Sequence, residues 1–371
     1  MSTLHTMFEL YGQSPWLEAT AHTDADVDPL GGALGDGIRG VTSTNRSLAV
    51  ALAGAGYDQF FAGVHGRGSA DLAEDLVATG ARASCDALED LYRDSMEALR
   101  EGRQRFGDGL VAVEMDPHLA DERAATIASA ARLASRVARP NVMISIPATP
   151  QGLAATIEVL GAGISVNVTL VNSVARYVEV FDAWLDGLEL AASNGLDVET
   201  IASTASFALA PVDVVYDSLF AHRNDPRLGT AAVSTAAGIY RQYRKLVNGR
   251  RATTLLERGA QLQRPLWTST APANPAYFDL LYVNHIASFE TAISLSPATV
   301  DLVLDHGECA TSMLLSTRNI KRTSYLVKDL PRSFSHVAIA RKLDRDELGE
   351  SLRAYDALID AVQAKVQRPH P

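Results

Sequence analysis

Residues 140–170 read PNVMISIPATPQGLAATIEVLGAGISVNVTL, and this stretch decides the fold. Val142–Ala148 and Ser165–Val171 are short runs rich in β-branched and apolar residues, which is typical of buried strands. Pro150–Leu160 lies between them and has the alanine-rich, amphipathic pattern of a helix. A strand, a helix and a second strand in this order predict a parallel βαβ unit.

The same alternation of strands and helices continues in both directions along the chain. Further strands are expected at Gly40–Thr44, Leu110–Met115, Leu266–Thr270 and Leu280–Ile286, and further helices at Asp121–Val137 and Val174–Leu188. The phosphate loop GxxxxGK[ST] is absent, which weakens a P-loop interpretation. We therefore predict an α/β fold, a single (β/α)8 barrel over residues 1–371. Extra helices are expected at both ends, with a charged helical extension over about 332–371 on the barrel exterior.

Composition excludes several classes of protein. The chain is 47% hydrophobic and 21% charged, as in soluble globular proteins, and its net charge of -11 argues against binding to nucleic acid or anionic lipid. Cys85 and Cys309 show no metal-binding or disulfide spacing, and neither a secretory signal nor an 18-residue apolar window is present. We expect a cytoplasmic monomer or small homo-oligomer that acts on a small-molecule substrate, without nucleic-acid or membrane partners.

Lysine is scarce. Only five of the 33 basic residues are lysine, and none precedes Lys245. Codon bias in a GC-rich genome explains such a ratio without any reference to function. The ratio still has a chemical consequence, because arginine stays protonated and cannot form a Schiff base.

Residues 140–153, PNVMISIPATPQGL, and 163–170, GISVNVTL, resemble the transaldolase family, particularly its longer actinobacterial form. The resemblance covers about residues 10–370. It includes the first, second, third and seventh strands, at Trp16–Glu18, Gly40–Ser43, Val111–Glu114 and Arg264–Tyr277. It implies a barrel of transaldolase type. It also implies an enzyme that moves a dihydroxyacetone unit between sugar phosphates through a lysine Schiff base, with no metal or cofactor.

Several positions depart from the family pattern. Ser145 occupies the fourth-strand position of the Schiff-base lysine, and a hydroxyl cannot form an iminium ion with a ketone. Pro211 and Ala273 stand where the family places an arginine and a lysine that hold the substrate phosphate. The resemblance therefore implies the barrel, whereas these departures argue against the family's own reaction.

Other positions match the family or keep its chemistry. Glu114 and Thr169 fall at the catalytic glutamate and at the threonine that positions a water, and Glu18 replaces a first-strand aspartate. The predicted substrate-binding residues are Asn167, Asn45, Arg46, Ser206 and Ser269. A glutamate inside an apolar barrel is expected to have a raised pKa suited to general acid–base catalysis. The alternative is that Glu114 and Asn167 only complete a polar network in the barrel interior.

An acidic stretch after the first strand has no counterpart in this resemblance. Asp24, Asp26 and Asp28 alternate in a segment expected at the carboxyl end of the barrel, where carboxylates can bind Mg²⁺ and bridge it to a phosphate. The alternative is an ordinary acidic loop that caps a helix.

Four functions remain open. The first is an enzyme that has lost Schiff-base chemistry. It would carry out acid–base chemistry (isomerisation, elimination, cyclisation or condensation) on a small metabolite of specialised biosynthesis. The others are a Mg²⁺-assisted lyase or transferase acting on a phosphate or diphosphate ester, a non-catalytic binding barrel, and a transaldolase of the pentose phosphate pathway.

Overall fold

The computed structural model describes residues 2–19, 30, 32–54, 57–62, 64, 66–219, 227–308, 314 and 335–367. Eight parallel strands pair in chain order and close into a barrel. They are β1 (Ser14–Glu18), β2 (Gly40–Ser43), β3 (Leu110–Glu114), β4 (Val142–Pro147), β5 (Val166–Thr169), β6 (Ser203–Ala208), β7 (Gln263–Thr268) and β8 (Ala292–Leu295). The predicted (β/α)8 barrel is confirmed.

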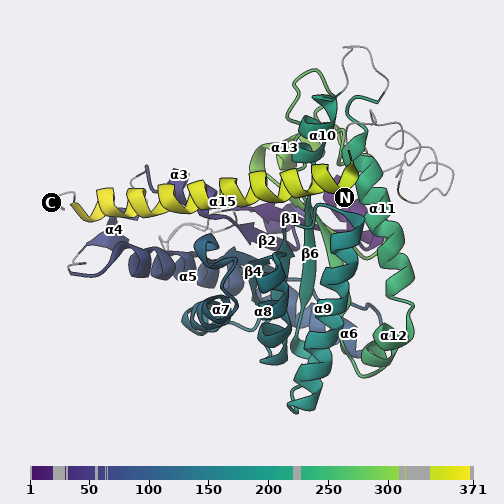
Figure 1. Cartoon of the computed structure of the whole chain (residues 1–371), viewed down its shortest axis with the longest axis horizontal. Coiled ribbons are helices and arrows are strands. Elements are labelled where there is room, and N and C mark those ends of the chain that lie inside the picture. Colours follow the sequence, from purple (N-terminus) through teal and green to yellow (C-terminus); the bar gives the residue numbers. More distant parts are fainter. Residues whose placement is uncertain are drawn as a thin grey trace.

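Helices surround this barrel (Figure 1). In chain order they are α1 (Thr3–Tyr11), α2 (Ala33–Asp36), α3 (Asn45–Ala51), α4 (Asp58–Phe61), α5 (Ser69–Ala87), α6 (Glu89–Arg100), α7 (Arg123–Val137), α8 (Pro150–Gly161), α9 (Val174–Ser193), α10 (Ala210–Asp217), α11 (Ala231–Leu246), α12 (Arg250–Glu257), α13 (Pro297–His306) and α15 (His336–Gln367). The described residues also include two 3₁₀ turns, η2 (Pro117–Leu119) and η3 (Val198–Thr200). Within the described ranges, no helix combines the length and apolar character that crossing a bilayer requires.

The expected strand at Leu280–Ile286 is wrong. These residues form consecutive turns, in which the Asn284 amide donates to the Leu280 carbonyl at 3.0 Å, as in a helical turn. The last strand is β8, only four residues long. The apolar run was ambiguous because its side chains are buried in either conformation, and periodicity over so few residues does not separate a strand from a helical turn.

The barrel interior changes from apolar to polar along the strands. Successive strand residues alternate between the interior and the surrounding helices, so every second side chain faces inward. One inward layer is an apolar cluster that includes Trp16, Met143 and Leu266. The inward positions two residues further on are Glu18, Ser145 and Thr268. The barrel is therefore sealed by packing below and lined by polar groups at its carboxyl end.

The turn between β4 and α8 depends on a close approach at Gly152. A Cβ atom added to Gly152 would lie 1.9 Å from the carbonyl oxygen of Pro147, which ends β4. The Gly152 amide donates to the Thr149 hydroxyl at 2.9 Å, which caps the helix. The glycine therefore lets α8 begin directly against the end of the strand that carries Ser145.

A buried ionic cluster tightens the opposite, amino end of the barrel. Asp108, fully buried, accepts hydrogen bonds from Arg264 at 3.1 Å, from Arg39 at 2.7 Å and from the Ser14 hydroxyl at 2.6 Å. Burial alone would raise the pKa of Asp108, but the two guanidinium groups and the hydroxyl hold that pKa below its usual value. The cluster joins β1, β7 and the segment before β3.

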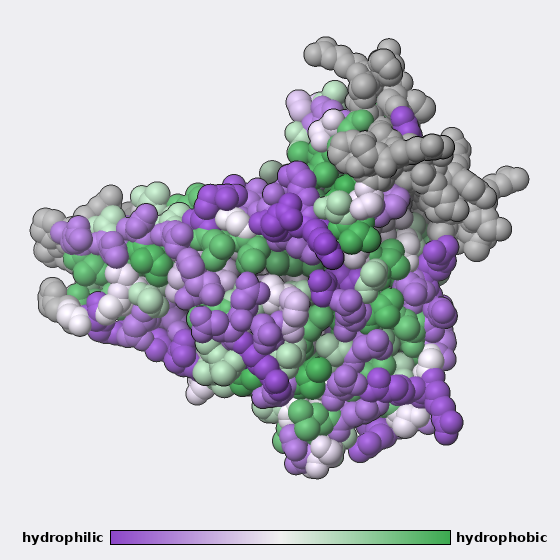
Figure 2. Space-filling model, viewed as in Figure 1, coloured by the Kyte–Doolittle hydropathy of each residue, from purple (hydrophilic) through white to green (hydrophobic). Residues whose placement is uncertain are grey.

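The C-terminal helix α15 was expected on the barrel exterior, but the structure places it across the carboxyl end (Figure 1). Its first half packs into the main core through Ile339 and Leu343. Its second half packs, through Leu358 and Val362, into a separate apolar cluster with residues of α3, α4 and α5. Figure 2 shows hydrophobic residues gathered along the line where α15 crosses the barrel, and hydrophilic residues over most of this face. The middle of α15 therefore spans the mouth between two anchored ends.

Candidate functional site

A cavity of about 540 Å³ opens at the carboxyl end of the barrel, beneath the middle of α15. All but one of the predicted catalytic and substrate-binding residues line it: Glu18, Arg46, Glu114, Ser145, Asn167, Thr169, Ser206 and Ser269. These side chains come from segments across most of the chain, and the barrel brings them to one end. This is the end at which (β/α)8 barrels carry their active sites.

Glu114 ends β3 and is the most strongly perturbed carboxyl group on the barrel strands. Its Oε2 accepts a hydrogen bond from the backbone amide of Asn45, at the start of α3, at 2.8 Å. Burial, with a contribution from the negative charge of Glu18, raises the pKa of Glu114 to about 7, and the Asn45 amide opposes this rise. A carboxyl group with this pKa can both accept and release a proton near neutral pH.

Ser145 stands beside Glu114, because the two residues are Cα partners in the β3–β4 register. The Asn167 side chain donates to the Ser145 hydroxyl at 3.1 Å, and its own carbonyl oxygen accepts from Thr204 at 2.8 Å and Ser206 at 2.6 Å. All of these side chains are buried. Since Ser145 accepts from Asn167, its hydroxyl proton remains available to donate within the cavity.

Glu18 ends β1 and lies on the same cavity wall. Burial raises its pKa, and the positive charge of Arg46 opposes the rise. Arg46 lies at the exposed rim, in the first turn of α3. Thr42 and Ser294 complete this polar layer, with their hydroxyl oxygens 2.6 Å apart.

Two residues of the cavity wall have strained backbone. Leu170 has a φ of 60° just after β5, and Ser269 has a φ of 51° just after β7. Side chains other than glycine rarely adopt this left-handed conformation, and where they do it is often at functional sites. Both residues line the cavity, so the strain is located at its mouth.

Asn45 is the one predicted binding residue that the cavity does not include. Its buried side chain donates to the Met115 carbonyl at 3.4 Å, and its amide holds Glu114. It lines a smaller cavity of about 370 Å³ that also touches Glu114 and Tyr355. Asn45 therefore positions Glu114 from behind, on the side away from the main cavity.

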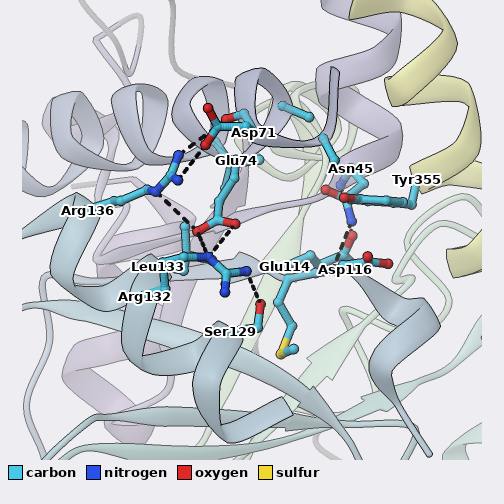
Figure 3. Close-up of a pocket in the computed structure, with 14 residues that line it drawn as sticks. Asn45, Asp71, Glu74, Glu114, Asp116, Ser129, Arg132, Leu133, Arg136 and Tyr355 are labelled. Carbon is cyan, nitrogen blue, oxygen red and sulfur yellow. Dashed lines mark hydrogen bonds and ion pairs between the residues drawn. The ribbon is translucent and has the colours of Figure 1, made fainter. Parts of the chain in front are cut away.

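The two arginines that line the smaller cavity, Arg132 and Arg136, form ion pairs with carboxylates of the protein (Figure 3). Arg136 pairs with Asp71 at 2.6 Å, and Arg132 pairs with Glu74 at 2.9 Å. These contacts link α5 to α7. They make the smaller cavity a helix–helix junction, and the larger cavity is the candidate active site.

No lysine is found among the described residues of the main cavity wall. Lys245 is exposed on α11, as expected, and Lys342 is exposed on α15, where it pairs with Asp346. Lys365 is buried far along α15 and donates to the Gly54 carbonyl at 2.7 Å. Lys321 and Lys328 lie outside the described residues, as does the predicted magnesium loop of Asp24, Asp26 and Asp28.

The sequence analysis did not foresee the contribution of α15 to this site. Glu347, Glu350, Ser351, Arg353, Ala354 and Ala357 all line the cavity. The small residues at helical spacing were the available signal, because a helix needs small side chains where it passes close over another surface. The pattern of small residues does not identify the surface over which the helix passes.

Comparison with known proteins identifies the family of this chain. A model of the transaldolase/fructose-6-phosphate aldolase family matches residues 25–361. The chain belongs to this family. A transaldolase of Trichodesmium erythraeum is 32% identical over the whole of both chains. Transaldolase 1 of Streptomyces coelicolor is 43% identical over 73% of this chain and 71% of its own, and a transaldolase of Mycobacterium leprae is 41% identical over 73% and 72%. The resemblance identified from residues 140–170 is confirmed.

Proposed function

We propose that this transaldolase-family protein catalyses proton transfer on a polyhydroxylated carbonyl compound without a lysine iminium. The observation that carries the proposal is the pairing of Glu114 with Ser145 on adjacent strands. The carboxyl group with a pKa of about 7 has a hydroxyl beside it, and the described residues of the cavity wall include no amine. That pair can remove a proton and polarise a carbonyl, but it cannot form an iminium ion with a ketone.

The proposed reaction begins with Glu114 as the base. Its carboxylate takes a proton from the carbon next to the substrate carbonyl. The C–H electron pair forms the enolate, and Ser145 donates a hydrogen bond to the enolate oxygen. Asn167 keeps the Ser145 oxygen occupied as an acceptor, so that the hydroxyl proton points toward the substrate. In an isomerisation, the proton of the hydroxyl on the deprotonated carbon moves to the enolate oxygen, and protonated Glu114 gives its proton to the former carbonyl carbon. In an elimination, protonated Glu114 gives its proton to the departing β-hydroxyl, which leaves as water while the enolate electrons form the C=C bond and restore the carbonyl.

Deuterium exchange tests this proposal without knowledge of the natural substrate. Dihydroxyacetone and D-fructose are incubated with the protein in D₂O, and loss of the signals of protons next to the carbonyl is followed by ¹H NMR. We expect exchange above the buffer rate, and a fall of roughly a hundredfold or more in Glu114→Gln. Asp116→Asn is the matched control, because Asp116 lines only the smaller cavity. Exchange that is absent, or unchanged in Glu114→Gln, would contradict the proposal.

A transaldolase reaction is the second candidate, and the names of the relatives favour it. It requires an amine that forms an iminium with the ketose, and Ser145 supplies none. The two candidates differ in one observable. Borohydride reduces an iminium to a stable covalent adduct, whereas the proposed enolate chemistry leaves the protein unmodified.

A further inference from the structure

Two arginines line the mouth of the main cavity. Arg46 lies in the first turn of α3, just beyond the end of β2, and Arg353 lies in the middle of α15. Both residues are exposed. The helices that carry them pack together, with Leu48 of α3 and Leu358 of α15 in one apolar cluster. The two guanidinium groups are therefore held at the same opening by neighbouring elements.

Neither arginine has a counter-ion within the part of the chain that the structure describes. No described carboxylate forms an ion pair with Arg46 or Arg353. By contrast, Arg132 and Arg136 of the smaller cavity are both paired (Figure 3). Arg46 acts on Glu18 only through its charge, which opposes the rise in the pKa of that carboxyl group. Both guanidinium groups at the mouth can therefore donate hydrogen bonds to a ligand.

Arg46 is tied through the backbone to the proposed base. The preceding residue, Asn45, donates its amide hydrogen to Oε2 of Glu114 at 2.8 Å. A ligand group bound by Arg46 is therefore fixed relative to the carboxylate that removes the proton. Ser145 and Ser206 supply hydroxyl groups on the cavity wall. These positions suit a polyhydroxylated chain with its carbonyl at the strand ends and an anionic group at the mouth.

The charge around the opening matches one negative charge on the ligand. Glu350 is exposed and lines the same cavity, so two arginines and one glutamate leave a net charge of +1 at the mouth. The charged groups on the strand ends are Glu18 and Glu114, both acidic. A carboxylate is therefore neutralised at the mouth, whereas the second charge of a phosphate dianion is not.

We propose that Arg46 and Arg353 form an anion subsite that binds the carboxylate of a sugar acid. The proposal rests on the proposed function, since it names the substrate class of the cavity in which Glu114 removes a proton. A guanidinium group presents paired N–H donors that match the two oxygens of a carboxylate. The bound carboxylate joins α3 to α15 across the mouth and sets the reacting carbonyl at the other end of the substrate.

Three acyclic six-carbon ligands test this proposal: D-gluconate, sorbitol and sorbitol 6-phosphate. Their affinities are measured by isothermal titration calorimetry at about pH 8, where a phosphate monoester is doubly charged. We expect gluconate to bind about fivefold or more tightly than sorbitol, the gain from two exposed charge pairs. Sorbitol 6-phosphate should bind more weakly than gluconate. The preference for gluconate should fall when salt is raised from about 0.02 M to about 0.5 M, because salt screens exposed charges.

Substitutions of the two arginines assign this preference to their side chains. Arg46→Gln and Arg353→Gln should each bring gluconate to within about twofold of sorbitol. Arg46→Lys should keep part of the preference, because it retains the charge but loses the planar pair of donors. Arg341→Gln is the matched control, since Arg341 is exposed on the same helix and lies outside the cavity lining. It should leave the ranking unchanged.

Three results would overturn the proposal. The first is binding of gluconate by the wild-type protein no tighter than that of sorbitol. The second is tighter binding of sorbitol 6-phosphate than of gluconate, which would make the mouth a phosphate subsite. The third is an unchanged preference for gluconate in both Arg46→Gln and Arg353→Gln.

The ligand ranking in the wild-type protein does not depend on the folding of any variant. None of the three ligands is a ketone or an aldehyde, so their binding does not require Glu114 to act as a base. Deuterium exchange on dihydroxyacetone and D-fructose, in turn, involves no anionic group. Failure of the anion subsite and failure of the proposed function are therefore distinguishable.

Discussion

Three influences set the protonation of Glu114. Burial disfavours the carboxylate, the charge of Glu18 on the neighbouring wall disfavours it further, and the Asn45 amide favours it. The net result is a pKa of about 7, the range in which a carboxyl group serves as a general base at neutral pH. Glu18 thus tunes the residue that is proposed to do the chemistry.

The pH dependence of deuterium exchange follows from this arrangement. A base must be ionised, so the exchange rate should rise with pH through a midpoint near 7. Glu18→Gln removes a negative charge that raises the pKa of Glu114, so the midpoint should move to lower pH. Rates measured between about pH 5 and pH 9 for the wild type, Glu18→Gln and the exposed control Glu350→Gln check this. A midpoint that stays in place in Glu18→Gln would contradict the assigned coupling.

Ser145→Lys tests how far the site differs from that of a transaldolase. The new lysine would stand beside Glu114, but Pro211, which lines the cavity, supplies no charge for a substrate phosphate. We expect transaldolase activity about a hundredfold or more below that of the Streptomyces coelicolor relative, since phosphate recognition normally uses charge-assisted hydrogen bonds. The measurement is transfer from fructose 6-phosphate to erythrose 4-phosphate. If the variant were as active as the relative, the residue at position 145 alone would account for the difference in activity between the two proteins, which would contradict this prediction.

At the level of elements, the sequence predicted strands most accurately where they are rich in β-branched residues and bounded by turn residues. Val142–Ala148 and Leu110–Met115 became β4 and β3 with ends within one residue. β8 was missed because four residues carry too little pattern, and Leu280–Ile286 was mistaken for it. The position of α15 also could not be predicted from the sequence. An amphipathic pattern identifies the face of a helix that is buried, but not the surface against which that face packs.

Gly152→Ala tests the junction between β4 and α8. The added Cβ atom would lie 1.9 Å from the Pro147 carbonyl oxygen, so the helix must move away from the strand end. We expect a loss of about 1–3 kcal/mol in the free energy of unfolding, measured by urea denaturation. Gly35→Ala is the control, because a Cβ atom there meets nothing within 4 Å. Equal stability of the two variants would contradict the close approach.

At the scale of the whole molecule, the buried ionic cluster and the candidate active site lie at opposite ends of the barrel. The buried cluster of Asp108, Arg39 and Arg264 joins strands at the amino end. The polar cavity and the spanning α15 lie at the carboxyl end. This division is general for (β/α)8 barrels, and it lets loops and helices at one end change without loss of the fold.

Asp108→Asn tests that division. It leaves Arg264, 1% exposed, without its carboxylate partner, and an unpaired buried charge costs roughly 3–5 kcal/mol in the free energy of unfolding. The exposed pair of Asp90 and Arg93 provides the control, and Asp90→Asn should cost less than about 1 kcal/mol. The deuterium exchange rate per folded molecule should be unchanged in both. A large loss of exchange in folded Asp108→Asn would show that the two ends are coupled.

The resemblance to the transaldolase family, and not the strand pattern, named Glu114, Ser145 and Asn167 as site residues. The structure places all three on the wall of one cavity. Glu347 was not predictable, because it reaches the same cavity from a helix that begins more than a hundred residues later in the chain. The scarcity of lysine is a property of the whole chain, and in this fold it leaves the described cavity wall without an amine.

Mass spectrometry after borohydride reduction tests the central claim most directly. The intact protein is incubated with fructose 6-phosphate and sodium borohydride, and its mass is compared with that of the Streptomyces coelicolor relative treated in the same way. The relative, as a transaldolase, should gain the mass of one reduced dihydroxyacetone unit. If the proposed mechanism holds, this protein should keep its original mass, because the Ser145 hydroxyl cannot form an iminium with the ketose. The same covalent adduct on this protein would contradict a lysine-independent mechanism.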